Sequence, residues 1–208
     1  MRIDKVILRA ALSTVAAIFL LFALMTATLC FAFPSTMMKL TYDLGMDGAS
    51  VSFASTAYGR SGSVYYIAYA TEIAIEAGDD GKTVSCGKKL VEDEEFSAYA
   101  AERNETAGKE NGAYEQYLYG KICTAEYRMG EKTLALQDAQ NFVPVGFPAS
   151  NALVAVTLEA IKAGDEESVS AALSLLRRIL TTQSATLSQI ESKDLSKLIE
   201  ATENWLNG

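Results

Sequence analysis

Apolar residues fill one uninterrupted stretch near the start of the chain, from Ala10 to Phe33, and these 24 residues include no charged side chain. An α-helix rises about 1.5 Å per residue, so the stretch would be roughly 36 Å long, and the hydrocarbon core of a bilayer is about 30 Å thick. The pattern predicts a transmembrane anchor over residues 10–33. A short segment, 1–9, precedes it, and a single helical-repeat domain, 34–208, follows it.

The charges beside the anchor predict its direction. Arg2, Lys5 and Arg9 precede it, whereas Lys39 follows it together with two aspartates. Positively charged residues gather on the cytoplasmic side of a membrane helix, so we expect a single-pass protein of the cell membrane with residues 1–9 in the cytoplasm and 34–208 outside. A cleaved secretory signal is the alternative, but its apolar region spans about 7 to 15 residues, and this stretch is longer.

Beyond the anchor, apolar residues recur at helical spacing, and no period-two strand pattern is found. The clearest case is residues 166–180, where Val169, Ala172, Leu173, Leu176 and Leu180 follow at steps of three and four. The fold class is therefore predicted to be all-α. Helices are expected in 35–58 (two short ones, separated at 44–48), 61–77, 82–91, 93–106, 113–129, 131–142, 150–163 and 166–180. A polar connection over 181–192 is expected to lead to a final helix that carries Leu195, Leu198, Ile199, Thr202, Trp205 and Leu206.

Glycine followed by an acidic residue marks the turns of three expected helix pairs, at Gly78-Asp79, Gly130-Glu131 and Gly164-Asp165. The last two glycines are 34 residues apart, and Gly45 precedes Gly78 by 33. The interval from Gly78 to Gly130 is 52 residues, which leaves room for one additional helix at 93–106.

A period near 34 residues with helix–turn–helix units resembles a tetratricopeptide repeat array. The resemblance is carried by Leu153, Val156, Ala160, Val169, Leu173 and Leu176 around Gly164, and by Tyr119, Ile122, Ala135, Ala139 and Phe142 around Gly130. The sequence departs from the repeat at Gly87, where a large apolar residue is expected, and at the small-residue position of the first helices, which holds Thr71, Cys123 and Thr157. The alternative is an irregular helical bundle.

The resemblance implies that the first helices line a concave face that binds peptides. On this chain the face would carry Tyr65, Glu72, Tyr117, Tyr127, Arg128, Asn151 and Lys162. Tyrosine suits such a surface, because its ring buries area while its hydroxyl stays hydrogen-bonded. In the alternative interpretation these tyrosines fill gaps between helices. The apolar segment 142–148 is expected to plug the seam between helix pairs.

Charge and composition exclude several classes of function. The net charge of the 208-residue chain is −8 and is concentrated after the anchor, which argues against a nucleic-acid partner. The chain has no histidine, so Ser-His-Asp and Cys-His catalysis and most catalytic zinc sites are excluded. The acidic run 92–95 is interpreted as a helix start rather than a cation site. The sequence therefore points to no catalytic residue, cofactor or metal.

Cys86 and Cys123 are the only cysteines after the anchor. Outside the cytoplasm they could form a disulfide, which would close a loop of roughly 37 residues. Free cysteine is also a common small core residue, and we expect two buried free thiols.

Together these features favour a membrane-tethered helical-repeat scaffold that binds a protein partner at the outer face of the cell membrane. A structural subunit of a larger membrane complex is a second hypothesis. A carboxylate-based extracytoplasmic hydrolase is a third, although no pair of acids in the sequence marks its active site.

Overall fold

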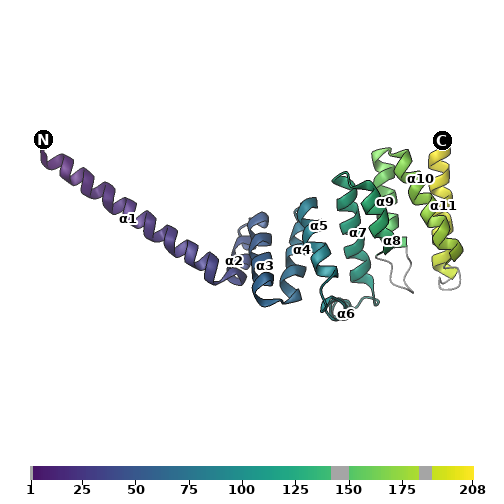
Figure 1. The fold of residues 1–208 in the computed structure, drawn as a ribbon, viewed down its shortest axis with the longest axis horizontal. Helices are drawn as coiled ribbons and strands as arrows, with labels where there is room; N and C mark the ends of the chain where they lie inside the picture. The colour runs from purple at the N-terminus through teal and green to yellow at the C-terminus, as the bar shows by residue number, and fades with distance from the viewer. Residues whose placement is uncertain (1, 142–149, 183–188) are drawn as a thin grey trace. The chain divides into compact units, whose positions relative to one another are not determined.

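The computed structural model describes residues 2–141, 150–182 and 189–208, and its helices are labelled in Figure 1. Within these ranges the secondary structure consists of helices without strands, so the predicted all-α class is confirmed. The chain divides into two compact units, Met1–Gly62 and Ser63–Gly208. The helices are α1 (Arg2–Ala32), α2 (Pro34–Asp43), α3 (Asp47–Ser61), α4 (Val64–Glu76), α5 (Asp80–Val91), α6 (Phe96–Thr106), α7 (Ala113–Arg128), α8 (Lys132–Asn141), α9 (Ser150–Ala163), α10 (Glu166–Thr182) and α11 (Gln189–Asn207).

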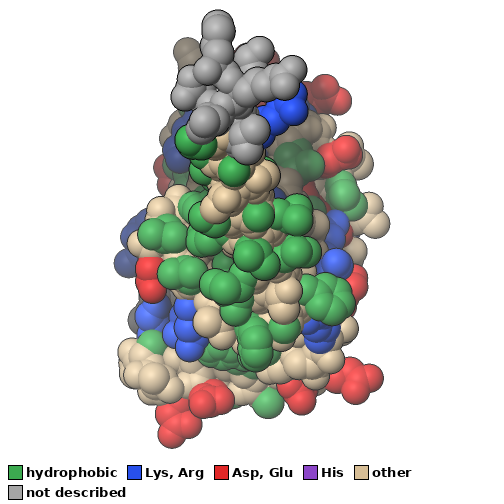
Figure 2. All heavy atoms as spheres, turned by 90° about the vertical axis from the view of Figure 1, so that its left-hand side faces the viewer, with side chains coloured by type: hydrophobic (Ala, Val, Ile, Leu, Met, Phe, Trp, Pro, Cys, Tyr) green, Lys and Arg blue, Asp and Glu red, His purple; other side chains and the backbone are tan. Residues whose placement is uncertain are grey.

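Helix α1 contains the predicted anchor. Its segment Arg9–Ala32 has a mean hydropathy of 2.5 and is long and apolar enough to cross a membrane. Figure 2, viewed from the end at which α1 begins, shows apolar side chains gathered over this helix. The few polar side chains within it return their hydroxyls to the helix backbone, as in Thr26 to the Phe22 carbonyl at 2.9 Å and Thr28 to the Leu24 carbonyl at 2.8 Å.

The first unit continues with a hairpin of α2 and α3. Pro34 opens α2 directly after Phe33, where its missing N–H costs no helical hydrogen bond. Ser50 of α3 donates its hydroxyl to the carbonyl of Met38 at 2.8 Å. Arg60, at the end of α3, donates to the carbonyl of Phe31 and lies 4.6 Å from the centroid of its ring. The end of α3 is therefore tied to the end of α1.

In the second unit the helices pack against one another in chain order. The pairs α4–α5, α7–α8 and α9–α10 each form a hairpin, α5 and α9 both pack on α7, and α11 packs on α10. The additional helix α6 lies against α7 and α4 rather than within a pair. The predicted start of α6 is wrong by three residues. Residues 92–95 form a turn, in which the Asp93 carboxylate accepts the N–H of Glu95 at 2.9 Å.

The three glycine–acid turns share one hydrogen-bond pattern. Gly78, Gly130 and Gly164 have positive φ of 67°, 90° and 68°, a conformation that costs little for a residue without Cβ. In each turn the N–H of the following acidic residue donates at 3.0 Å to the carbonyl five residues earlier, as in a Schellman motif. In two of the turns this acid also caps the next helix: Asp79 accepts from the N–H of Lys82, and Asp165 from that of Ser168.

The core confirms the register predicted for residues 166–180. Val169, Ala172 and Leu176 are fully buried and Leu173 is 6% exposed, while Leu180 is partly buried. They pack in one cluster with Leu153, Val156 and Ala160 of α9.

The positions at which the sequence departs from the repeat also lie in the core. Thr71, Cys123 and Thr157 are all 0% exposed, and both threonine hydroxyls bond to the carbonyl four residues earlier. Gly87 faces Ile122, and a Cβ at position 87 would lie 2.6 Å from Cγ1 of that isoleucine. Gly87 thus allows α5 to approach α7 more closely than a larger residue would.

Cys86 and Cys123 are both buried, and no disulfide joins them in this structure. Burial raises the pKa of the Cys123 thiol far above its usual range, and the charge of Glu126 adds to this effect. A neutral, buried thiol of this kind behaves as a small apolar side chain.

Candidate functional site

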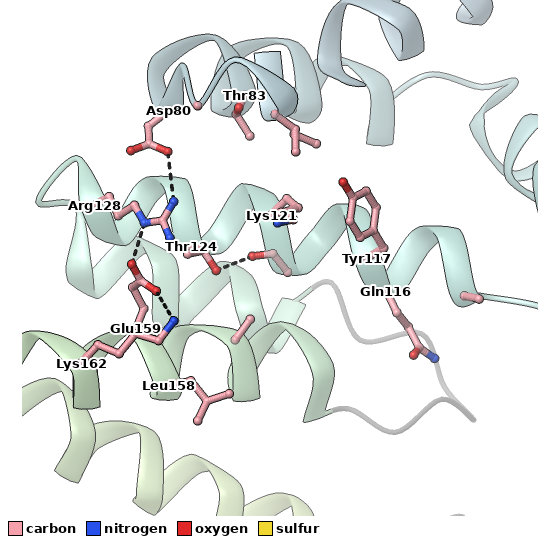
Figure 3. Close-up of a pocket in the computed structure, with 15 residues that line it drawn as sticks. Asp80, Thr83, Gln116, Tyr117, Lys121, Thr124, Arg128, Leu158, Glu159 and Lys162 are labelled. Atoms are coloured by element: carbon pink, nitrogen blue, oxygen red, sulfur yellow. Dashed lines mark hydrogen bonds and ion pairs between the residues drawn. The ribbon is translucent and has the colours of Figure 1, made fainter. Parts of the chain in front are cut away.

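A groove of about 540 Å³ runs between α7 and α9 in the second unit, and its upper edge is formed by the end of α4 and the start of α5 (Figure 3). Helix α7 contributes Tyr117, Lys121, Thr124 and Arg128, which lie at steps of three and four and therefore share one face of the helix. Helix α9 contributes Ala155, Leu158, Glu159 and Lys162 by the same spacing.

One end of the groove is a chain of ion pairs (Figure 3). Nε of Arg128 lies 2.7 Å from Oε1 of Glu159, and the same arginine reaches Asp80 of α5 at 3.9 Å. Lys162 lies 3.6 Å from the other oxygen of Glu159. The hydrogen bond from Arg128 lowers the pKa of Glu159, and Glu159 in turn raises the pKa of Arg128. The charges at this end are matched within the protein and fix α5, α7 and α9 relative to one another.

The other part of the groove is apolar and also carries the side chain of Lys121. Leu158 is 45% exposed and Tyr117 is 49% exposed. Nζ of Lys121 lies 5.5 Å from the centroid of the Tyr117 ring, within the range of a cation–π interaction. Within the described part of the chain Lys121 forms no ion pair. This part offers exposed apolar area and a positive charge to a ligand.

The structure brings together three of the seven residues predicted to bind a partner: Tyr117, Arg128 and Lys162 all line the groove. Glu72 lines an adjacent cavity of about 330 Å³, to which Tyr117 also contributes. Tyr65 lies at a separate cavity between α4 and α6. Asn151 is in α9 by position, but its side chain is outside the described residues, as is the segment 142–148.

Tyr127 does not line the groove. Its side chain is 6% exposed and packs in the core, and its hydroxyl donates to Oδ2 of Asp165 at 2.8 Å. Burial and the hydrogen bond with Asp165 raise its pKa to about 12. The reason is helical phase: Tyr127 is one residue from Arg128 and so points about 100° away from the groove. For this residue the gap-filling interpretation is the correct one.

Sequence analysis missed Lys121, Leu158 and Glu159. For Lys121 a signal was present, because Lys121 and Thr124 continue the steps of three and four from Tyr117 to Arg128. Leu158 gave no such signal, since an apolar residue in an amphipathic helix is normally assigned to the core.

A second group of charges lies inside the domain, away from the groove. Lys88 of α5 contacts both Glu126 of α7 and Asp138 of α8. Burial disfavours the charge of Lys88, but the contacts with Asp138 and Glu126 outweigh it and raise the pKa of Lys88 to about 12. None of these three residues lines the groove, so they join helices rather than act on a ligand there.

The described residues contain no group of three or more Cys, Asp and Glu side chains that could hold a metal ion. The groove itself combines apolar area, matched ion pairs and Lys121, an arrangement suited to binding a chain segment. Comparisons of the sequence and structure with protein-family models, curated proteins and solved structures found no match.

Proposed function

We propose that this chain is a membrane-tethered scaffold whose second unit binds a segment of a protein partner in the groove between α7 and α9. The observation that carries the proposal is the exposed pair Tyr117 and Leu158, which both line a groove of about 540 Å³. Exposed aromatic and aliphatic side chains in a depression are the usual anchors of a protein interface.

The neighbouring ion pairs support the proposal. Arg128 is held by Glu159 and Asp80, so this end of the groove is ordered before a partner arrives. A preordered groove loses less conformational entropy on binding. The glycine–acid turns fit a tetratricopeptide-like array of hairpins, in which the first helices, here α7 and α9, present the binding face.

The tether is α1, and the excess of Arg and Lys before it favours an orientation that places the second unit at the outer face of the cell membrane. A scaffold held in this way keeps its partner close to the membrane, which raises the effective concentration of the two proteins.

Capture of partners from membranes tests the groove. The full chain, tagged and extracted in mild detergent after cross-linking, is compared as wild type, Leu158→Glu and Leu134→Glu. Leu134 of α8 is the matched control, because it is 36% exposed and does not line the groove. We expect Leu158→Glu to lose proteins that wild type and Leu134→Glu both retain. An identical set of captured proteins for all three chains would overturn the proposal.

A further inference from the structure

The additional helix α6 is fixed against α7 by a buried asparagine. Asn104 is 1% exposed; its Oδ1 accepts the N–H of Tyr114 at 2.8 Å, and its Nδ2 donates to Oε2 of Glu115 at 2.9 Å. Phe96 and Ala100 are buried on the same side of α6. These contacts hold α6 at a fixed position on α7.

Arg103 is the one cation of α6, and its charge is used within the protein. Its NH2 group donates to both carboxylate oxygens of Glu72, at 2.8 and 3.0 Å, and the hydroxyl of Tyr114 donates to Oε1 at 3.0 Å. The hydrogen bond and charge of Glu72 raise the pKa of Arg103 further. Arg103 also lines the cavity described next, but its guanidinium is paired with Glu72.

A cavity of about 540 Å³ lies between α4 and α6, beside this ion pair. Tyr65 of α4 is 51% exposed and stacks on Tyr69 at 6.5 Å between ring centroids, while Tyr99 of α6 packs edge-on against Tyr114 at 5.8 Å. Tyr65 and Tyr99 line the cavity, and the ring of each packs against another tyrosine ring.

The rim of the cavity carries two uncompensated carboxylates. Glu95 and Glu102 both line it, are exposed, and form no ion pair in the described part of the chain. Glu95 lies in the turn before α6 and Glu102 lies within α6, and both border the same cavity. With Arg103 neutralised by Glu72, the cavity combines aromatic walls with a net negative rim.

We propose that this cavity binds an arginine or lysine side chain of a protein partner. A guanidinium or ammonium group is attracted to the face of a tyrosine ring and forms charge-assisted hydrogen bonds with carboxylates. Arginine fits better than lysine, because its planar group can stack on Tyr65 while it donates to a carboxylate. The inference rests on the partner-binding role proposed above and specifies the partner: its bound segment carries a basic residue.

The test uses the full chain in a non-ionic detergent and a fluorescent peptide of alternating glycine and arginine with blocked ends, followed by fluorescence anisotropy. The variant Glu95→Gln/Glu102→Gln is compared with Glu166→Gln/Glu167→Gln, which removes the same charge from the exposed first turn of α10. We expect the first variant to weaken binding by about fivefold or more and the second by less than about twofold.

Substitutions of Tyr65 provide an independent test of the cavity. Tyr65→Ala should weaken binding of the same peptide, and Tyr65→Phe should retain it, because the cation contacts the ring rather than the hydroxyl. Equal losses for the two double glutamine variants, no effect of Tyr65→Ala, or no binding to wild type would each overturn the inference.

The variant Leu158→Glu separates this inference from the proposed function. It should bind the arginine peptide as wild type does, because Leu158 does not line the cavity between α4 and α6. Peptide binding that is lost in Leu158→Glu would overturn the assignment to this cavity. If only the partner-capture experiment fails, the proposal that the groove binds a partner is contradicted, and the proposal that the cavity binds a cationic side chain is not.

Discussion

Lys88 of α5 and Glu126 of α7 meet in an ion pair with 2.5 Å between Nζ and Oε1, at a place where the Glu126 side chain is only 1% exposed. Asp138 of α8 lies 2.7 Å from the same ammonium. The ammonium group of Lys88 therefore contacts two carboxylates at once. The second carboxylate leaves an excess negative charge in the interior, which opposes folding. The cluster joins three helices, but it does so at a cost that depends on pH.

Acidification from neutral pH should relieve this cost. Burial raises the pKa of Glu126; the ion pair with Lys88 opposes the shift, and Asp138 adds to it. Because the folded state binds this proton more tightly than the unfolded state, the free energy of unfolding should rise as pH falls through the raised pKa, and stop rising below the ordinary glutamate pKa of about 4.3.

Glu126→Gln isolates this effect, since the amide keeps the volume and removes the titrating group. Thermal unfolding followed by circular dichroism between pH 7 and pH 5 should show a larger increase in stability for wild type than for Glu126→Gln. At pH 7 the variant should be at least as stable as wild type, because Lys88 still pairs with Asp138. Parallel pH profiles of the two proteins would contradict the raised pKa.

Asp165 should show the opposite pH dependence. Its hydrogen bonds with Lys132, Ser168 and Tyr127 lower its pKa well below the usual range. A lowered pKa contributes stability that is present above the unfolded value, about 3.9, and is lost as pH falls below it. Asp165→Asn should therefore lower the free energy of unfolding by about 2 kcal/mol near pH 7, because the helix cap and the charged hydrogen bonds are lost.

Urea unfolding at a series of pH values measures this loss. The difference between wild type and Asp165→Asn should shrink below about pH 3.9, where the unfolded carboxyl is protonated. Asp194→Asn is the control: this aspartate pairs with Lys197 in the same helix, both side chains are 65% exposed, and such pairs contribute little. If both substitutions cost the same, the interactions of Asp165 are no stronger than those of a surface pair.

Gly87→Ala should destabilise the second unit. The new Cβ would lie 2.6 Å from Cγ1 of the fully buried Ile122, and overpacking of this kind costs about 1 to 3 kcal/mol, against a gain in helix propensity of up to about 1 kcal/mol. Gly81→Ala in the same helix is the control, because its Cβ would meet only the Asp79 carboxylate, at an ordinary 3.7 Å. That variant should be as stable as wild type or slightly more stable.

A double-mutant cycle identifies the contact responsible. Ile122→Ala alone should cost about 2 to 4 kcal/mol through the cavity it leaves. Gly87→Ala in the Ile122→Ala background should cost less than in wild type, because the obstructing atoms are gone. Additive losses in chemical denaturation would show that the two positions do not press on each other.

The direction of α1 can be tested in whole cells. A reporter that is active only outside the cytoplasm, fused after Gly208, should be active, and the extracted protein should retain its N-terminal segment. In the control, Arg2, Lys5 and Arg9 are replaced by glutamine. This removes the charge bias and should reduce the fraction of chains with the C-terminus outside the cytoplasm. A mature chain that begins near Phe33 would identify the apolar stretch as a cleaved signal.

The sequence by itself determined the features that depend on neighbours along the chain. The turns at Gly78, Gly130 and Gly164 were predictable because their hydrogen bonds span only five residues and require a glycine at positive φ. The apolar face of α10 was predictable because residues three and four apart share a face of any helix. The apolar stretch within α1 was likewise evident from composition and length alone.

Only the tertiary structure decided which side chains face solvent and which are consumed by distant partners. Tyr117 and Tyr127 belong to one helix and were both predicted to bind a partner. In the structure Tyr127 lies in the core, hydrogen-bonded to Asp165, 38 residues away, while Tyr117 stays half exposed. Arg103 likewise pairs with Glu72, 31 residues before it, and is therefore not available to a ligand. Helical periodicity assigns residues to faces, but whether a face becomes core, groove or rim depends on which helix packs against it, and that is set by contacts between residues far apart in the chain.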